Sequence, residues 1–446
     1  MAEPLRIAVR DVRAAFAPRA RWVLGEFAAA LGRRSVFVGD ADADLTYAPT
    51  APREGVWIPA QREAQAFFEE RRLAPARAVS RSRGLTLLFP PAAPEAAIPG
   101  DIVAGAFYLM ARWDEHVVEE RDRWGRLPLS ASAFRHIEGL SLEEPPVEGY
   151  LAALRAGLGI APPTAWSVPV THDIDRVRRR TPKALAGIAR RRGPAGVARA
   201  LIGPDPWRNL TDLLGASATR GIASTVFLIG RNAHPLDGTP RRAYDRERPA
   251  MARAIRASGG EVGLHAAFAS SESGQALREE LAALRQEVGA VEGVRFHYLR
   301  FRYHETVRWL EDAGVTYDAS LGFSEAPGFA AGIARPFRPY LIGEERPADL
   351  TLVPLAVMDT TLHSHLSLTA SGGVERALGV LDVVRRHGGR AALLWHNTSL
   401  ADDRAPGYGD ALRTVLAELG ARGAELGPIL PPEAPDGGAL DLSLIH

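Results

Sequence analysis

Apolar and polar positions along the first third of the chain predict strands and helices in alternation. Residues 5–9 form an apolar run typical of a short strand, and residues 19–31 carry apolar side chains at helical spacing. Residues 101–117 predict an amphipathic helix whose charged end, residues 112–126, we expect to be a solvated face with charge pairs. Further short strands are predicted at residues 35–39, 43–48, 55–60 and 86–90, and a helix at 147–158. This alternation is typical of a small α/β domain.

The rest of the chain repeats the alternation over a greater length. The predicted strands are 168–173, 222–230, 261–265, 294–301, 315–320, 350–357 and 391–397, and the predicted helices are 211–219, 249–258, 275–288, 306–313 and 373–387. Strands separated by helices predict a parallel sheet, closed or nearly closed into a barrel. We place a boundary near Pro162, which predicts an N-terminal α/β domain (1–162), a barrel (163–430) and a C-terminal tail (431–446).

Polar residues gather where the predicted strands of the barrel end. In residues 168–175, VPVTHDID, the extended backbone would turn Asp173 and Asp175 to the same side. Two carboxylates so close resist ionising together unless a cation or an arginine lies between them, although the same residues would also suit a helix N-cap. Other predicted strands end at His265, His297, Arg300, Asp318 and His396. Active sites of such barrels lie at this edge of the sheet.

Composition and charge narrow the classes of function. The formal net charge of +1 over 446 residues gives no reason to expect a nucleic-acid partner, and the arginine-rich segment 176–199 is most simply a solvated face. The absence of cysteine excludes disulfides, thiolate metal sites and cysteine nucleophiles. The N-terminus lacks the apolar core of a signal peptide, and no apolar run is long enough to span a membrane. We therefore expect a cytoplasmic protein; its oligomeric state is not predicted.

Five segments occur in an order known from one family of enzymes. They are THDID (171–175), ASTVFLIG (223–230), EVGLHAAF (261–268), LRFRYHETVRWLEDAGVTYDAS (299–320) and ALLWHN (392–397). Together they resemble the motifs of the polysaccharide deacetylases (carbohydrate esterase family four), and more narrowly a bacterial subgroup with an extra N-terminal domain. The resemblance implies an incomplete (β/α) barrel.

The resemblance also implies a division of labour among the residues at the strand ends. Asp173 would be the general base, Asp175 and His265 metal ligands, and His396 the acid that protonates the leaving group. Arg300 or Arg295 would pair with Asp173, and Asp318 would orient one of the histidines. Two positions depart from the family pattern, because Ala269 stands where a second histidine ligand is usual and Arg302 where a proline is usual.

His297 on the neighbouring predicted strand is our candidate for the missing third ligand, with His172, His304 and water as alternatives. Two histidines and a carboxylate suit Zn²⁺, with Co²⁺, Mn²⁺, Ni²⁺ and Fe²⁺ as other candidates. The expected function is the removal of an acetyl or other acyl group from an N-acetylated sugar or glycan precursor. Hydrolysis of a non-sugar amide or other C–N bond, and a non-catalytic binding or scaffolding role, are the alternatives.

Overall fold

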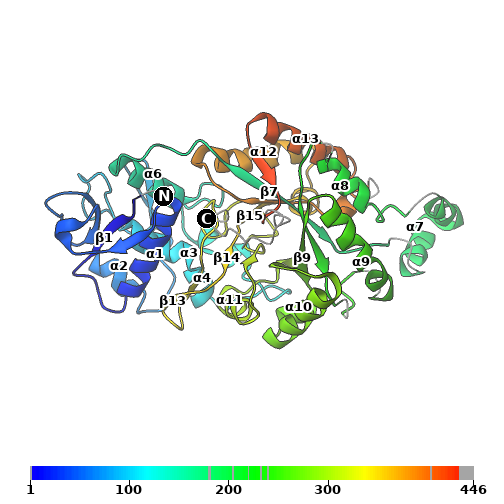
Figure 1. The fold of residues 1–446 in the computed structure, drawn as a ribbon, viewed down its shortest axis with the longest axis horizontal. Helices are drawn as coiled ribbons and strands as arrows, with labels where there is room; N and C mark the ends of the chain where they lie inside the picture. The colour runs from blue at the N-terminus through cyan, green and yellow to red at the C-terminus, as the bar shows by residue number, and fades with distance from the viewer. Residues whose placement is uncertain are drawn as a thin grey trace.

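The protein is described from a computed structural model, in which residues 3–178, 182–202, 205–218, 220–231, 234–238, 241–401 and 404–430 are placed. Two parallel sheets with their helices form the molecule, the N-terminal one at the left of Figure 1 and the larger one at its centre and right. The predicted tail, parts of the arginine-rich segment and the last residue of the predicted helix 211–219 lie outside these residues. No helix of the described residues is long and apolar enough to cross a membrane.

The N-terminal sheet has four parallel strands in the order β2-β1-β3-β4. Its strands are β1 (Leu5–Val9), β2 (Ser35–Phe37), β3 (Leu45–Ala48) and β4 (Val56–Pro59), and the helices of this part are α1 (Ala17–Ala30), α2 (Arg62–Phe67), α3 (Ile102–Met110), α4 (Trp113–Val117), α5 (Ala133–His136) and α6 (Pro146–Gly157). The strand predicted at residues 86–90 is instead β6 (Leu85–Leu87), half of an antiparallel hairpin with β5 (Ser80–Ser82). The four strands of the sheet agree with the predicted pattern.

The larger sheet is parallel throughout and follows the order β14-β11-β10-β9-β8-β7-β16-β15, with β17 also paired to β7. Its strands are β7 (Ser167–Ile174), β8 (Thr225–Ile229), β9 (Glu261–Ala266), β10 (Gly293–Phe296), β11 (Tyr317–Asp318), β14 (Thr351–Leu352), β15 (Leu355–Met358), β16 (Ala392–Leu394) and β17 (Glu425–Gly427). The connecting helices are α7 (Pro182–Leu201), α8 (Leu210–Ala218), α9 (Arg241–Ala257), α10 (Gly274–Val288), α11 (Tyr303–Asp312), α12 (Ala370–His387) and α13 (Tyr408–Ala421).

This sheet is curled into an incomplete barrel. The end strands β14 and β15 are separated by only two residues, Val353 and Pro354. Because two residues span less than about 10 Å, the two edges of the sheet must lie close together. They are neighbours in space without forming a ladder with each other, since the sheet path runs from one to the other through all the remaining strands. The predicted barrel is therefore open at this seam.

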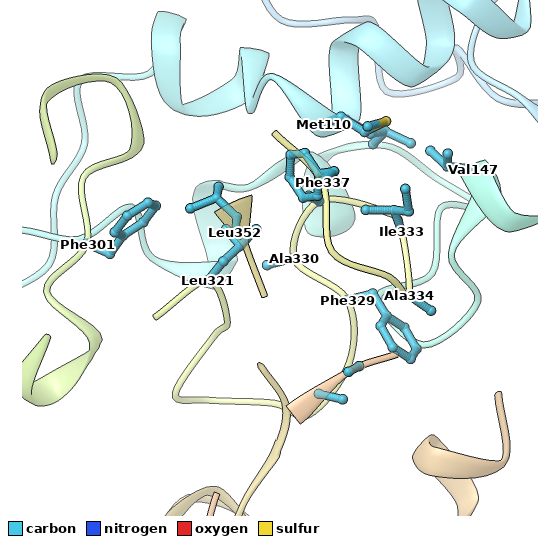
Figure 2. Packing of buried hydrophobic residues seen from close by; sticks show 14 of the residues in the cluster. Met110, Val147, Phe301, Leu321, Phe329, Ala330, Ile333, Ala334, Phe337 and Leu352 are labelled. Atoms are coloured by element: carbon cyan, nitrogen blue, oxygen red, sulfur yellow. The ribbon is translucent and has the colours of Figure 1, made fainter. Parts of the chain in front are cut away.

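The two sheets share a continuous apolar core. The segment after β11 passes beneath α3 and α6, and Figure 2 shows Ile333 and Phe337 near Met110 of α3 and Val147 of α6. Val147 donates its backbone N–H to the carbonyl of Gly332 at 3.0 Å. The N-terminal helices thus pack directly on the barrel portion of the chain.

Two predicted helices differ from the structure. The helix expected at 101–117 breaks into α3 and α4 at Arg112, which adopts a left-handed conformation with φ of 49°. Its charged end is not solvated as expected, because Asp114 and Glu115 are buried and Glu115 accepts the backbone N–H of Tyr303 at 3.0 Å. The helix expected to start at Pro249 begins instead at Arg241, so that Pro249 lies within α9.

Candidate active site

The carboxyl ends of β7, β9, β10 and β16 bring acidic, imidazole and guanidinium groups into one cluster. Asp173 is the next-to-last residue of β7 and is 2% exposed, and Asp175 follows the strand. Alternation along the extended backbone turns both carboxylates toward the same side. His265 comes from β9, and His396 lies two residues beyond the end of β16. These are four of the positions at which polar residues were predicted to meet.

Asp175, His265 and His297 form a group that could hold a metal ion. One potential ligand atom from each lies within 4.8 Å of the others. His297 sits just beyond β10, not within a strand as expected, in a short turn over His297–Leu299. His265 Nε2 is 3.1 Å from Asp175 Oδ1, and His297 Nε2 is 3.8 Å from Asp175 Oδ2.

In the neutral form of His265, its hydrogen bonding leaves the Nε2 lone pair aimed into this group. Its Nδ1 lies 3.0 Å from the carbonyl of Arg295, which can only accept, so Nδ1 carries the proton. Nε2 and the facing Asp175 Oδ1 are both buried without a hydrogen-bond partner. Two acceptor atoms 3.1 Å apart repel unless a proton or a cation lies between them. Their chemistry and that of His297 fit a divalent metal with nitrogen and oxygen ligands.

Asp173 is paired with Arg295. The Arg295 guanidinium is fully buried, and its Nη1 donates to Asp173 Oδ1 at 3.0 Å and to Thr171 Oγ1 at 2.8 Å. Its Nε donates to the carbonyl of Ala319 at 2.9 Å. These contacts hold the arginine rigidly, so it fixes the orientation of Asp173.

Arg300, the other candidate partner, faces a different direction. It pairs with Glu272, and its guanidinium carbon lies 3.6 Å from the centre of the Phe268 ring. The reason is local, because Tyr298 and Leu299 both adopt left-handed backbone conformations, with φ of 60° and 52°. The chain turns sharply there and carries Arg300 away from Asp173, so the expectation for Arg300 was wrong.

His396 is oriented by Asp359, a residue for which the sequence suggested no role. Asp359 follows β15, and its Oδ1 lies 2.7 Å from His396 Nδ1 while Oδ2 accepts the His396 backbone N–H at 3.0 Å. His396 Nε2 then points toward the two aspartates, 4.0 Å from Asp173 and 3.9 Å from Asp175. Burial alone would lower the pKa of His396, but Asp359 and Asp175 outweigh it and raise that pKa to about 9.

Asp318 was expected to orient a histidine, and the structure contradicts this. Its carboxylate accepts the backbone N–H of Ser320 at 2.7 Å and the Ser320 hydroxyl at 2.8 Å. Burial raises the pKa of Asp318 to about 7. The Asp318 carboxylate therefore stabilises the turn after β11. The role expected of Asp318, orienting a histidine, belongs to Asp359.

The alternative histidine ligands point elsewhere. His172 alternates with Asp173 along β7, and its Nδ1 donates to the carbonyl of Trp395 at 2.9 Å. His304 lies on α11, with Nε2 3.2 Å from the carbonyl of Arg112. Neither belongs to the group formed by Asp175, His265 and His297.

A cavity of about 250 Å³ opens above the cluster. Asp173, Asp175 and the three histidines line it from the sheet. It is also lined by Met358 at the end of β15 and by residues from the segments that follow β15 and β16, namely Thr360, Ser364, His365 and Arg404. The loop after α4 contributes Arg123, Trp124 and Arg126. The N-terminal part of the chain thus contributes to the same cavity.

Sequence analysis missed three features of this site. Asp359 directly follows β15 and could have been found by the rule that located His265. Asp237 is fully buried 3.6 Å from His297 Nδ1, but it lies in a loop without regular spacing. Trp124 and Arg126 lie in the other part of the chain, and no periodic pattern connects them with the cavity.

Comparisons with known proteins give one family match and two structures of low similarity. Residues 23–160 match a family of unknown function (DUF7033), and no curated protein matches the chain. A candidate polysaccharide deacetylase from Mycobacterium smegmatis is 20% identical, with 60% of this chain and 89% of that chain covered and a TM-score of 0.41. A CE4 family pseudoenzyme from Bacillus anthracis is 14% identical, with 60% and 65% covered and a TM-score of 0.33. These values assign neither family nor activity, so the function must be argued from the site.

Proposed function

We propose that the chain is a metal-dependent hydrolase that removes an acyl group, such as acetyl, from an N-acylated sugar or glycan precursor. The observation that carries this proposal is the meeting of His265 Nε2 and Asp175 Oδ1, two buried acceptors 3.1 Å apart, beside an arginine-paired Asp173 and a carboxylate-paired His396. A structural role explains each pair singly, but not their convergence on one cavity.

The ligands proposed for the metal are Asp175, His265 and His297. Two imidazoles and one carboxylate are a usual set for catalytic zinc, and they leave further coordination positions open. The contact of His265 Nδ1 with a backbone carbonyl fixes the tautomer that presents Nε2, as is common for histidine ligands. A bound divalent cation would polarise the acyl carbonyl and lower the pKa of a water molecule.

The remaining groups supply the two proton transfers that amide hydrolysis needs. Asp173 accepts the proton of the attacking water, because Arg295 holds its carboxylate in place beside the cluster. His396 donates a proton from Nε2 to the departing amine, and Asp359 keeps its ring charged and in place. The base and the acid are thus two different residues, each held by its own charged partner, Arg295 for Asp173 and Asp359 for His396.

The substrate side of the proposal rests on the motif resemblance and on the form of the cavity. The cavity is lined by polar groups, by the rings of Trp124 and Tyr298, and by the apolar side chains of Phe296, Leu299 and Met358, a mixed lining that suits a small ligand with polar groups and apolar faces. An N-acylated sugar is a ligand of this kind. The substrate panels described next distinguish it from a non-sugar amide.

The test is release of acetate from matched panels of N-acetyl sugars and N-acetyl amino-acid amides by zinc-loaded protein. We expect release from sugars, and a loss of about a hundredfold or more in Asp173→Asn at unchanged zinc content. Asp101→Asn is the matched control, since Asp101 is also buried, at 3% exposed, but caps α3 in the N-terminal part. Release from the amides alone would indicate the other hydrolase class, and none from either panel by zinc-loaded protein would contradict catalysis on these compounds.

A further inference from the structure

Residues 119–128, here called the strap, connect α4 with the turn at Leu129–Ala131 and reach the cavity above the strand ends. The strap lies within the region that matches a family of unknown function. Its side chains Arg123, Trp124 and Arg126 line the cavity beside Tyr298 and His297. It is therefore the part of the N-terminal region that is closest to the chemistry.

Three rings are stacked from the strap to the proposed metal ligand. The Trp124 ring is parallel to that of Tyr298, with a centroid distance of 4.4 Å and an interplanar angle of 7°. Tyr298 stacks in turn on His297, at 4.1 Å and 22°. The guanidinium of Arg123 also lies over the Trp124 ring, 4.9 Å from the ring centre. The plane of the His297 ring is thus set by a stack that begins in the strap.

The strap also holds the backbone of Tyr298. This residue has φ of 60° and ψ of 17°, a left-handed backbone conformation that residues other than glycine rarely adopt. Arg126 Nη1 donates to the Tyr298 carbonyl at 2.7 Å, while Asp122 accepts from Arg126 Nε and Nη2 at 2.9 and 2.7 Å. The arginine is therefore fixed at one end by its carboxylate and supports the turn at the other.

His297 needs this support more than His265 does. The Nδ1 of His265 is held by a backbone carbonyl at 3.0 Å, whereas the Nδ1 of His297 lies 3.6 Å from Asp237, beyond hydrogen-bonding distance. The His297 ring is consequently held by its stacking on Tyr298 together with the ion-pair contact to Asp237. We infer that the strap is a positioning element of the metal site: Trp124, through Tyr298, holds His297 in the orientation for binding the metal. This inference rests on the proposed function.

The test compares Trp124→Leu, which removes the ring, with Trp124→Phe, which keeps a ring able to stack. Zinc affinity is measured by competition with a chromophoric chelator, and the visible spectrum of the Co²⁺ form reports ligand geometry. We expect Trp124→Leu to bind zinc about 10- to 100-fold more weakly and to change the Co²⁺ spectrum, as for other residues that orient metal ligands. Trp124→Phe should stay close to wild type.

Trp57→Leu is the matched control, because Trp57 is also a half-buried N-terminal tryptophan but bonds to Ala48 in the distant sheet. It should lower thermal stability without changing zinc affinity. Wild-type affinity and spectrum in Trp124→Leu, or an equal loss in Trp124→Phe, would overturn the inference while leaving the proposed function in place. Failure of the wild-type protein to bind zinc or Co²⁺ would overturn both.

Discussion

The buried ion pair between Glu148 and Arg335 gives a quantitative test of how the N-terminal helices are joined to the barrel. Glu148 on α6 is fully buried. Its Oε1 accepts from the backbone N–H of Ala334 at 3.0 Å and from Arg335 Nε at 2.9 Å, and its Oε2 accepts from Arg335 Nη2 at 2.6 Å. The replacement Glu148→Gln keeps the shape and one acceptor but leaves the arginine without its counter-charge.

The expected cost follows from burial. Breaking a buried pair on one side leaves an uncompensated charge in a medium that solvates it poorly, which typically lowers the free energy of unfolding by about 3–5 kcal/mol. Arg335 also donates to the carbonyl of His387, and this contact remains, so we expect a loss near the lower end of that range. Replacing both partners, as in Glu148→Met with Arg335→Met, should recover much of the loss because no buried charge remains.

Urea unfolding followed by circular dichroism measures the difference. The matched control is Glu143→Gln, since Glu143 pairs with Arg376 across the same two parts of the chain but both side chains are 38% exposed. An exposed pair of this kind is worth about 0–1 kcal/mol. A loss in Glu148→Gln no larger than that in Glu143→Gln would refute the reasoning that burial makes this contact essential.

Two further predictions concern pH and the proposed acid. Burial would raise the pKa of Glu148, but Arg335 outweighs it and holds that pKa below the ordinary value of 4.5. The stability advantage of wild type over Glu148→Gln should therefore be complete above about pH 4.5 and should vanish as the pH falls through the lowered pKa. Urea unfolding at several pH values checks this prediction. Asp359→Asn should leave zinc content unchanged but lower acyl release about tenfold or more at neutral pH, because His396 loses the carboxylate that orients it and keeps it protonated; unchanged turnover would remove Asp359 from the account.

The sequence predicts much of the fold because the relevant patterns are local. The buried strands around Val170, Phe227 and Leu393 are short apolar runs, and the helices between them have 3.6-residue periodicity. In a parallel sheet the carboxyl ends of all strands meet at one edge, so locating the strands also locates Asp173 and His265.

The sequence could locate the polar residues near the strand ends, but it could not predict which way their side chains point. Arg295 and Arg300 lie five residues apart near one strand end, and only the left-handed turn at Tyr298 and Leu299 decides which one reaches Asp173. Tyrosine and leucine give no sign of such a turn, whereas glycine would have. Asp318 ends β11 and Asp359 directly follows β15, and the pairing of β15 with β16 decides that Asp359 lies beside His396.

The contribution of the N-terminal region was equally hidden from the sequence. The break at Arg112 turns the predicted amphipathic helix, so that Asp114 and Glu115 become buried, Glu115 against Tyr303 of the barrel, and the chain continues toward the cavity. A buried ion pair and a solvated one have the same residue types at the same spacing. Tertiary contacts alone distinguish them.

Titration of chelator-treated protein with Zn²⁺ in a calorimeter tests the central claim most directly. The account predicts one zinc ion per chain, bound by wild type and by His136→Ala, in which the altered histidine lies 3.1 Å from a carbonyl in the N-terminal part. It predicts much weaker binding by His265→Ala, because this variant lacks the ring nitrogen that faces Asp175. Absence of zinc binding by the wild type, or equal affinity in His265→Ala, would contradict the proposed metal site.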